Sequence, residues 1–386
     1  MKKRIAYAVL ASMALLGAMW MRVSAQNSVK NVAKVGVANA AVAKAMPPDS
    51  IPTYSTENIA RTGFFYVGGK YVGEPGKEVM DGAMYVEVWV PKQIQHPYPI
   101  VFFHGAGQTG TDWLQTPDNR PGWAYYLIAQ GYTLYMVDYP ARGRSAYVPG
   151  VDGSLTIRTA NDLESIWTNV KEKGNFPLKN NHTQWPGAGK MGDPIFDNFA
   201  KGQVEFLGGG PNNAEKLNMD AGVALLDRIG NPVILVTHSM GGGVGWAVAD
   251  ARPNLVKGIV TVEPGGGINN LKLHYDPPVA DPKEIKTYKE EKGEREGENP
   301  CTLQEAPVHK LVSLEHIAIL SVSGNGGYHR QGDACTPKWL NQAGVKTDFV
   351  RLEDVGINGN GHEMFFEKNS DQIIKFLDDW MRKNVK

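Results

Sequence analysis

Residues 233–243 have the sequence VILVTHSMGGG, and this stretch is the starting point for interpreting the chain. The apolar run Val233–Val236 has the composition of a buried strand, and the residues from Gly241 to Ala251 follow a helical pattern. Ser239 lies between them, beside three glycines. A strand, a tight turn with a serine and then a helix form the arrangement called a nucleophile elbow. The usual G-x-S-x-G pattern has one departure, because its first glycine is Thr237 here.

Similar apolar runs recur before and after this stretch and alternate with amphipathic segments. Residues 62–90 predict antiparallel strands that precede the rest, and within them Met84, Val86, Val88 and Val90 alternate with Tyr85, Glu87 and Trp89. Alternating strands and helices predict an α/β fold with a mostly parallel, doubly wound sheet. The expected strands are Ile100–Phe103, Thr133–Val137, Val233–Val236, Ile259–Val262, Ile317–Val322 and Thr347–Leu352, and the expected helices are Ala214–Arg228, Gly241–Ala251 and Asp371–Lys383.

The N-terminal segment has the features of an export signal. Lys2, Lys3 and Arg4 precede an apolar stretch, which ends in a small-residue site at Ala25. This predicts a signal peptide over residues 1–25, with cleavage near Ala25, and a product in the periplasm or the medium. The alternative is an uncleaved membrane anchor. Residues 26–50 are expected to be a linker of little fixed structure, followed by one folded domain over residues 51–386.

The composition excludes some classes of partner. The chain has 386 residues with 40 basic and 40 acidic side chains, and no run of like charges. This balance gives no support for binding to nucleic acid or to an anionic membrane. The sequence gives no indication of oligomeric state.

Two segments interrupt the alternation of strands and helices. Residues 146–213 are rich in Gly, Asn and Pro and are expected to form a cap over the site, whereas residues 275–300 are rich in charge and are expected to be a solvated excursion. The two cysteines, Cys301 and Cys335, are expected to form a disulfide because exported proteins usually pair their cysteines. Two free thiols are the alternative.

A glycine-rich loop follows the first parallel strand. Ile100–Phe103 leads directly into residues 104–110, HGAGQTG. In an elbow fold, this loop and the residue after the nucleophile each supply a backbone N–H to a developing oxyanion. We therefore expect the N–H groups of Ala106 and Met240 to form an oxyanion hole, with His104 as a structural residue of the turn.

A serine hydroxyl requires a base, and the position of the histidines favours His362. It lies in the Asn/Gly-rich segment 358–364 after the last predicted strand and before the terminal helix, the place of the base in this kind of fold. The remaining histidines, His238 and His329 among them, do not occupy that place and are expected to have surface or packing roles. They also lack the spacing of a zinc site, so no metal is expected.

Two carboxylates are candidates for the residue that orients His362. Glu263 ends the strand Ile259–Val262 and is preferred, because a carboxylate at the carboxyl edge of the sheet can reach the imidazole. Asp333 follows the next strand at a greater distance along the chain and is the alternative.

These residues together resemble the α/β-hydrolase superfamily. They are most similar to a small group of secreted bacterial esterases with a glutamate after the sixth strand. Further shared segments are His104–Gly110, Gly122-Trp123, Gly131-Tyr132, Arg142–Ser145 and Val262–Gly265. The resemblance implies a serine carboxylesterase without metal or organic cofactor. Members of that group have adjacent cysteines in the oxyanion loop where this chain has Ala106-Gly107, so substrate preference is expected to differ.

The predicted function is therefore hydrolysis of a small or medium carboxylic ester through an acyl-enzyme on Ser239. Fold and triad do not distinguish esters from lactones, thioesters or amides. Epoxide hydrolase and dehalogenase chemistry is disfavoured because both need an aspartate at the elbow. A non-catalytic binding module on the same fold remains an alternative.

Overall fold

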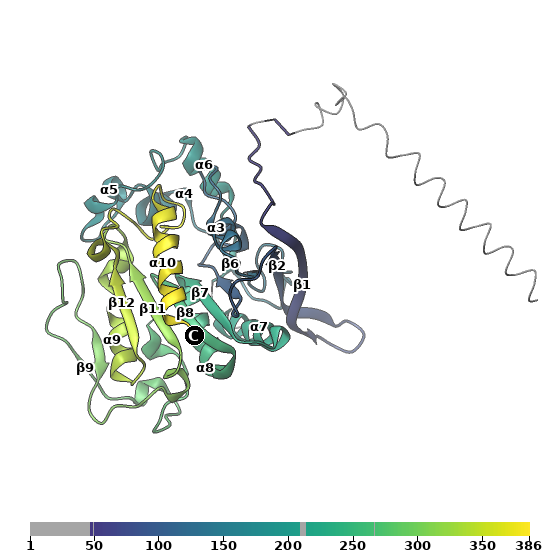
Figure 1. Ribbon diagram of the computed structural model, residues 1–386. Helices are drawn as coiled ribbons and strands as arrows, with labels where there is room; N and C mark the ends of the chain where they lie inside the picture. Colours follow the sequence, from purple (N-terminus) through teal and green to yellow (C-terminus); the bar gives the residue numbers. More distant parts are fainter. Residues whose placement is uncertain (1–46, 49, 209–213, 266) are drawn as a thin grey trace, which may run out of the picture. The chain divides into compact units, whose positions relative to one another are not determined.

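The computed structural model describes residues 47–48, 50–208, 214–265 and 267–386 (Figure 1). The expected signal peptide, its cleavage site and most of the expected linker lie outside these residues. The chain divides into two units, Met1–Tyr54 and Ser55–Lys386. Every element discussed below belongs to the second unit.

Within the described residues, eight strands form the central sheet in the order β1-β2-β4-β3-β7-β8-β11-β12. β2 pairs antiparallel with β1 and β4, and every further pair is parallel. The structure thus confirms a mostly parallel sheet that begins with antiparallel strands. The strands are Ile59–Val72 (β1), Val79–Pro91 (β2), Ile100–Phe103 (β3), Leu134–Asp138 (β4), Val233–His238 (β7), Val256–Val262 (β8), Ala318–Ser323 (β11) and Thr347–Arg351 (β12).

Helices cover both faces of this sheet, and the strand residues alternate between the two faces. On β3, Phe102 packs into the core shared with α3 and α10, and its neighbour Phe103 packs into the core shared with α7, α8 and α9. Burial on both sides explains why the strands are uninterrupted apolar runs in the sequence. These helices span Trp123–Ala129 (α3), Ala214–Ile229 (α7), Met240–Ala251 (α8), Cys335–Gln342 (α9) and Ser370–Asn384 (α10).

The first insertion lies between β4 and α7 and is built from short elements. Its α4, α5 and α6 gather at one end of the sheet (Figure 1). Trp167 and Phe199 are buried in the same core as α3 and α10, so the insertion packs on the sheet domain. The elements are Leu155–Thr156 (β5), Ala160–Leu163 (α4), a π-helical turn Glu164–Thr168, Val170–Lys173 (α5), Pro194–Lys201 (α6) and Phe206–Leu207 (β6).

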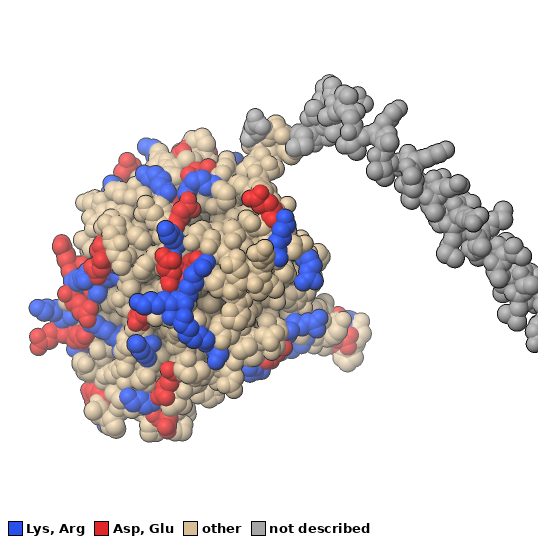
Figure 2. All heavy atoms as spheres, viewed as in Figure 1, with Lys and Arg blue, Asp and Glu red and all other residues tan. Residues whose placement is uncertain are grey.

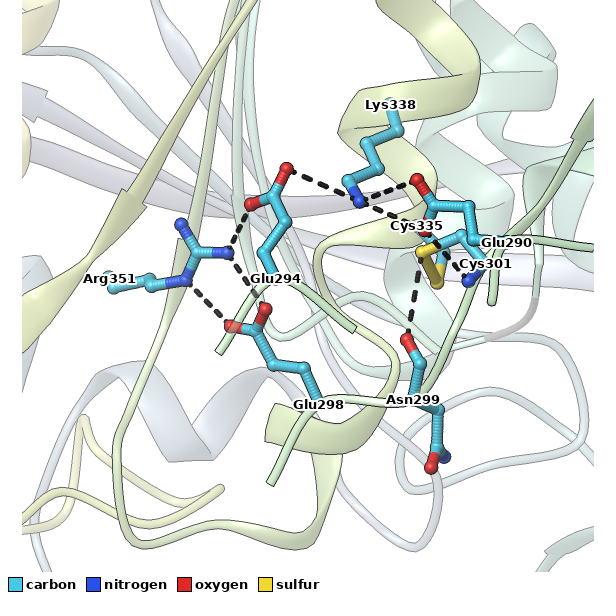
Figure 3. The surroundings of a disulfide bond; sticks show 8 residues. All are labelled: Glu290, Glu294, Glu298, Asn299, Cys301, Cys335, Lys338 and Arg351. Carbon is cyan, nitrogen blue, oxygen red and sulfur yellow. Dashed lines mark hydrogen bonds and ion pairs between the residues drawn. A yellow bond between two sulfur atoms is a disulfide. The ribbon is translucent and has the colours of Figure 1, made fainter. Parts of the chain in front are cut away.

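The second insertion is fastened to the sheet domain by a disulfide. Its β9 (Thr287–Lys289) and β10 (Thr302–Gln304) form an antiparallel pair. Cys301 precedes β10 and is bonded to Cys335, the first residue of α9, with 5.1 Å between the Cα atoms (Figure 3). This is the pairing expected from the sequence.

Ion pairs fasten the same insertion close to the disulfide. Arg351 on β12 pairs with Glu298 at 2.6 Å and with Glu294 at 2.7 Å, and Lys338 on α9 pairs with Glu290 at 2.9 Å (Figure 3). The Glu298 side chain is only 1% exposed and also pairs with the buried Arg330. The expectation of a solvated excursion is therefore wrong for Glu298, because the positive charges of Arg330 and Arg351 stabilise its buried carboxylate.

Charges of both signs are distributed over the visible face of the molecule, among large areas of other residues (Figure 2). Among the described residues, no helix combines the length and the apolar character needed to cross a membrane.

Candidate active site

The turn between β7 and α8 holds Ser239 in a strained conformation. Its φ of 50° and ψ of −123° lie outside the regions that side-chain-bearing residues favour. Close packing after the serine enforces this turn. A Cβ on Gly241 would lie 2.4 Å from the carbonyl oxygen of Phe103, so only glycine fits there. Ser239 itself remains partly exposed at the end of the sheet.

Thr237 occupies the position that glycine usually takes before the serine. Its side chain is fully buried, and its hydroxyl donates to Thr261 on β8 at 2.8 Å. A Cβ on Gly245 of α8 would lie 2.8 Å from the Thr237 methyl group. The chain therefore accommodates the larger Thr237 because Gly245 leaves space for the methyl group and Thr261 satisfies the hydroxyl.

His362 and Glu263 form a buried pair beside this turn. His362 Nδ1 lies 2.7 Å from Glu263 Oε2, and both side chains are fully buried. The other carboxylate oxygen of Glu263 accepts the N–H of Gly324, at 2.8 Å. His362 Nε2 is buried and has no hydrogen-bond partner among the described residues. The pairing of Nδ1 thus leaves Nε2 available for a reacting group.

Burial favours the neutral forms of both groups. It lowers the pKa of His362 well below the ordinary value, and the neighbouring His329 acts in the same direction. It raises the pKa of the Glu263 carboxyl, an effect that the Gly324 N–H opposes. A neutral imidazole is the form that can accept a proton from a hydroxyl.

The loop after β3 lies directly against Ser239. A Cβ on Gly105 would be 3.1 Å from Ser239 Cβ, and its carbonyl oxygen accepts Arg142 Nη1 at 2.9 Å, which fixes the loop. Ala106 follows Gly105 and is partly exposed, as is Met240. Met240 is the first residue of α8, so its N–H has no acceptor within the helix. Of the two predicted N–H donors, Met240 therefore directly follows Ser239, and Ala106 belongs to the loop that contacts it.

A buried polar chain supports His362 from β7. His238 Nε2 lies 3.0 Å from the carbonyl oxygen of His362, and His238 Nδ1 lies 3.1 Å from Gln108 Oε1. Gln108 Nε2 donates in turn to Glu363 Oε2 at 2.6 Å. Burial lowers the pKa of His238 to about 3 and raises the pKa of Glu363 to about 8, so it favours the neutral form of both side chains.

Asp333, the alternative acid, contacts a different histidine. Its Oδ1 lies 3.3 Å from His329 Nδ1, and its Oδ2 accepts the Ser323 hydroxyl at 2.5 Å. The His329 ring stacks on His362 with 4.2 Å between ring centroids and 15° between planes. The structure therefore pairs His362 with Glu263 and places a second acid–imidazole pair against it.

The first insertion supplies a further wall of the site. The Trp167 ring is stacked on His362, with 6.2 Å between centroids and 20° between planes. Arg158 lies over the Trp167 ring, with 4.9 Å from its Cζ to the centroid. Val204 N–H donates to the carbonyl oxygen of Gly107 at 2.9 Å, which ties the insertion to the loop after β3.

Among the described residues, two groups of side chains have potential metal ligands within 4.8 Å of one another, and both include His362. One adds His238 and Glu363, and the other adds Glu263 and His329. Several of these ligand atoms already form hydrogen bonds: His362 Nδ1 with Glu263, and both ring nitrogens of His238. A metal at either place would have to displace them.

Comparison with known proteins identifies the class. The model of the alpha/beta hydrolase family matches residues 100–375, and the chain belongs to this family. It is 40% identical over 338 residues to the probable secreted lipase phiG of a fungal species (strain ATCC 74256), covering 83% of this chain and 90% of that protein. A bacterial esterase solved at atomic resolution is similar in fold, with a TM-score of 0.62 at 21% identity over 87% of this chain and 99% of the other.

The sequence patterns predicted Ser239, Glu263 and His362 as site residues but did not predict which side chains surround them. They indicated only packing or surface roles for His238 and His329, which lie against His362, and they did not place any side chain of the first insertion. The one available signal was the position of His238 next to Ser239. The other contacts depend on long-range packing that no local pattern records.

Proposed function

We propose that the protein is a serine hydrolase that cleaves small or medium carboxylic esters, with Ser239 as nucleophile, His362 as base and Glu263 as the acid that orients it. The observation that supports this most is the buried His362–Glu263 hydrogen bond, which leaves Nε2 of the imidazole without a partner next to a strained serine turn. Catalytic hydrogen bonds to the nucleophile are often long before substrate binds and shorten in the complex.

In the proposed reaction, the Ser239 oxygen attacks the ester carbonyl while its proton passes to His362 Nε2. The N–H groups of Ala106 and Met240 stabilise the oxyanion, and each such donor contributes roughly 3–4 kcal/mol. Glu263 stabilises the imidazolium that forms. His362 then protonates the leaving alcohol, and water attacks the acyl-enzyme by the same path in reverse.

The relatives support the ester bond as the target, since one is named a secreted lipase and another an esterase. Export of this chain is proposed from its N-terminal sequence together with the disulfide, which suits an oxidising compartment. The periplasm and the medium are both compatible with these features.

Replacement of the nucleophile tests the proposal. We expect Ser239→Ala to reduce kcat on a small ester by about 10⁴-fold or more, because no other group can form the acyl-enzyme. The measurement is hydrolysis of p-nitrophenyl acetate and of an alkyl ester, with thermal unfolding as a check of folding. The exposed Ser55 gives the control, since Ser55→Ala should retain wild-type rates. Ester hydrolysis retained by Ser239→Ala would refute the assignment.

A further inference from the structure

Arg158 occupies an unusual place in the first insertion, between β5 and α4. It is partly exposed, but its Nε atom is buried and has no hydrogen-bond partner in the part of the chain that the structure describes. The guanidinium lies between two aromatic rings, with its Cζ 4.9 Å from the centroid of Trp167 and 5.8 Å from that of Phe206. Stacking on aromatic faces holds a guanidinium in position. Its N–H groups lie in the plane of the guanidinium, so stacking leaves them able to donate to another group.

The other arginines show how this chain normally satisfies such a group. Within the described residues, every other arginine that is buried or half-buried interacts with a carboxylate or a main-chain carbonyl group. Among the residues that the structure describes, Arg158 has no carboxylate within 4.0 Å and donates no hydrogen bond. The paired arginines are Arg120, Arg142, Arg144, Arg252, Arg330 and Arg351.

The unpaired charge lies close to the proposed reaction centre. The Trp167 ring lies next to both groups: Arg158 Cζ is 4.9 Å from its centroid, and the centroid of the His362 ring is 6.2 Å from it. The distance between the guanidinium and the imidazole is therefore at most the sum of these two distances. At this range the positive charge lowers the pKa of His362 and thereby disfavours the imidazolium that must form during attack. A negative charge brought by the substrate would cancel this cost and would satisfy the guanidinium.

We propose that Arg158 binds a carboxylate of the substrate, so that the ester cleaved at Ser239 carries a negative charge on its acyl or its alcohol part. This inference rests on the proposed function and adds a substrate class to it. Arg142 lies over the same Phe206 ring, at 5.4 Å, but it donates to the carbonyl group of Gly105, so the proposal assigns the carboxylate to Arg158. The planar guanidinium can donate two parallel N–H bonds to such a group.

Two matched pairs of esters test the inference. Monoethyl glutarate and diethyl glutarate differ by a carboxylate on the acyl side, and 4-acetoxybutyrate and butyl acetate differ by a carboxylate on the alcohol side. We expect the wild type to favour the charged member of at least one pair in kcat/KM, and Arg158→Leu to reduce that preference about 10- to 100-fold, the range of a charge-assisted hydrogen bond. Arg158→Lys should retain part of it.

The control is Arg228→Leu, which removes an exposed arginine near the end of α7 and should leave the ratio unchanged. The inference is overturned if the wild type favours neither charged ester, or if Arg158→Leu and Arg158→Lys both keep the wild-type preference. Hydrolysis of the neutral esters that depends on Ser239 would then leave the proposed function standing. If no ester of either pair is hydrolysed, the proposed function fails and the inference fails with it.

Discussion

Two acid–imidazole pairs lie side by side in this molecule, and they are built in different ways. Glu263 and His362 are 99 residues apart in sequence, fully buried and 2.7 Å apart in space. Asp333 and His329 are four residues apart, 3.3 Å apart in space and partly open, with the His329 side chain 15% exposed. The two histidine rings are stacked with 4.2 Å between their centroids, so the two pairs are in direct contact.

The difference lies in what each pair needs in order to form. A histidine and an aspartate four residues apart meet within one turn of local structure. Glu263 and His362 meet only because β8 and the segment after β12 end at the same edge of the sheet. Our proposal gives proton transfer to the Glu263–His362 pair, since only the geometry of this pair depends on the fold that also positions Ser239.

The largest expected effect separates the two acids. We expect Glu263→Gln to reduce kcat by about 10⁴-fold, because the amide would hold His362 in the wrong tautomer. Asp333→Asn should cost less than about 10-fold in kcat, because Asp333 bonds to His329 and not to His362. Steady-state rates on one ester, with unfolding temperatures as a folding control, compare them. Equal losses in the two variants would contradict the assignment of the acid.

An intermediate effect concerns what holds the second pair in place. His329 and Asp333 lie just before Cys335, whose disulfide to Cys301 closes a loop of 34 residues. We expect Cys301→Ser/Cys335→Ser to lower the free energy of unfolding by about 3–4 kcal/mol, the loop-entropy contribution for this length. Denaturant unfolding measures it, and wild type in reductant should approach the variant. A loss below about 1 kcal/mol would show that the ion pairs of Arg351 and Lys338 suffice.

The smallest expected effect tests the contact between the two rings. The positive charge of His329 lowers the pKa of His362, so its removal in His329→Phe should raise that pKa. Because kcat/KM rises as His362 loses its proton, the acid limb of the pH profile should move to higher pH. His316→Phe, at an exposed histidine near the start of β11, should not move it. An unchanged limb, or a shift to lower pH, would contradict a charge interaction between the rings.

The sequence allowed the sheet and the strand-end residues to be predicted, because their physical causes are local. Strands buried on both faces are apolar throughout, and an elbow requires glycine where α8 meets the loop after β3. The sequence shows that Thr237 replaces the usual glycine before the serine, but it does not show how the larger side chain is accommodated. Gly245 and Thr261 accommodate it through contacts that form only in the folded chain.

The surroundings of the site could not be predicted for the same physical reason. The stacking of Trp167 on His362 and of Arg158 on Trp167 joins elements separated by many residues, with no periodic pattern to indicate it. The burial of Glu298 is a similar case. A charge-rich segment normally remains in water, and here the positive charges of Arg330 and Arg351 offset the desolvation of the Glu298 carboxylate.

The most direct test of the central claim is mass spectrometry of the folded protein after treatment with a fluorophosphonate, which modifies only an activated serine. The account predicts a single adduct on the peptide that contains Ser239, and much slower formation of that adduct in Glu263→Gln. Folded wild-type protein without an adduct, or with the adduct on another serine, would contradict the claim that His362 and Glu263 activate Ser239.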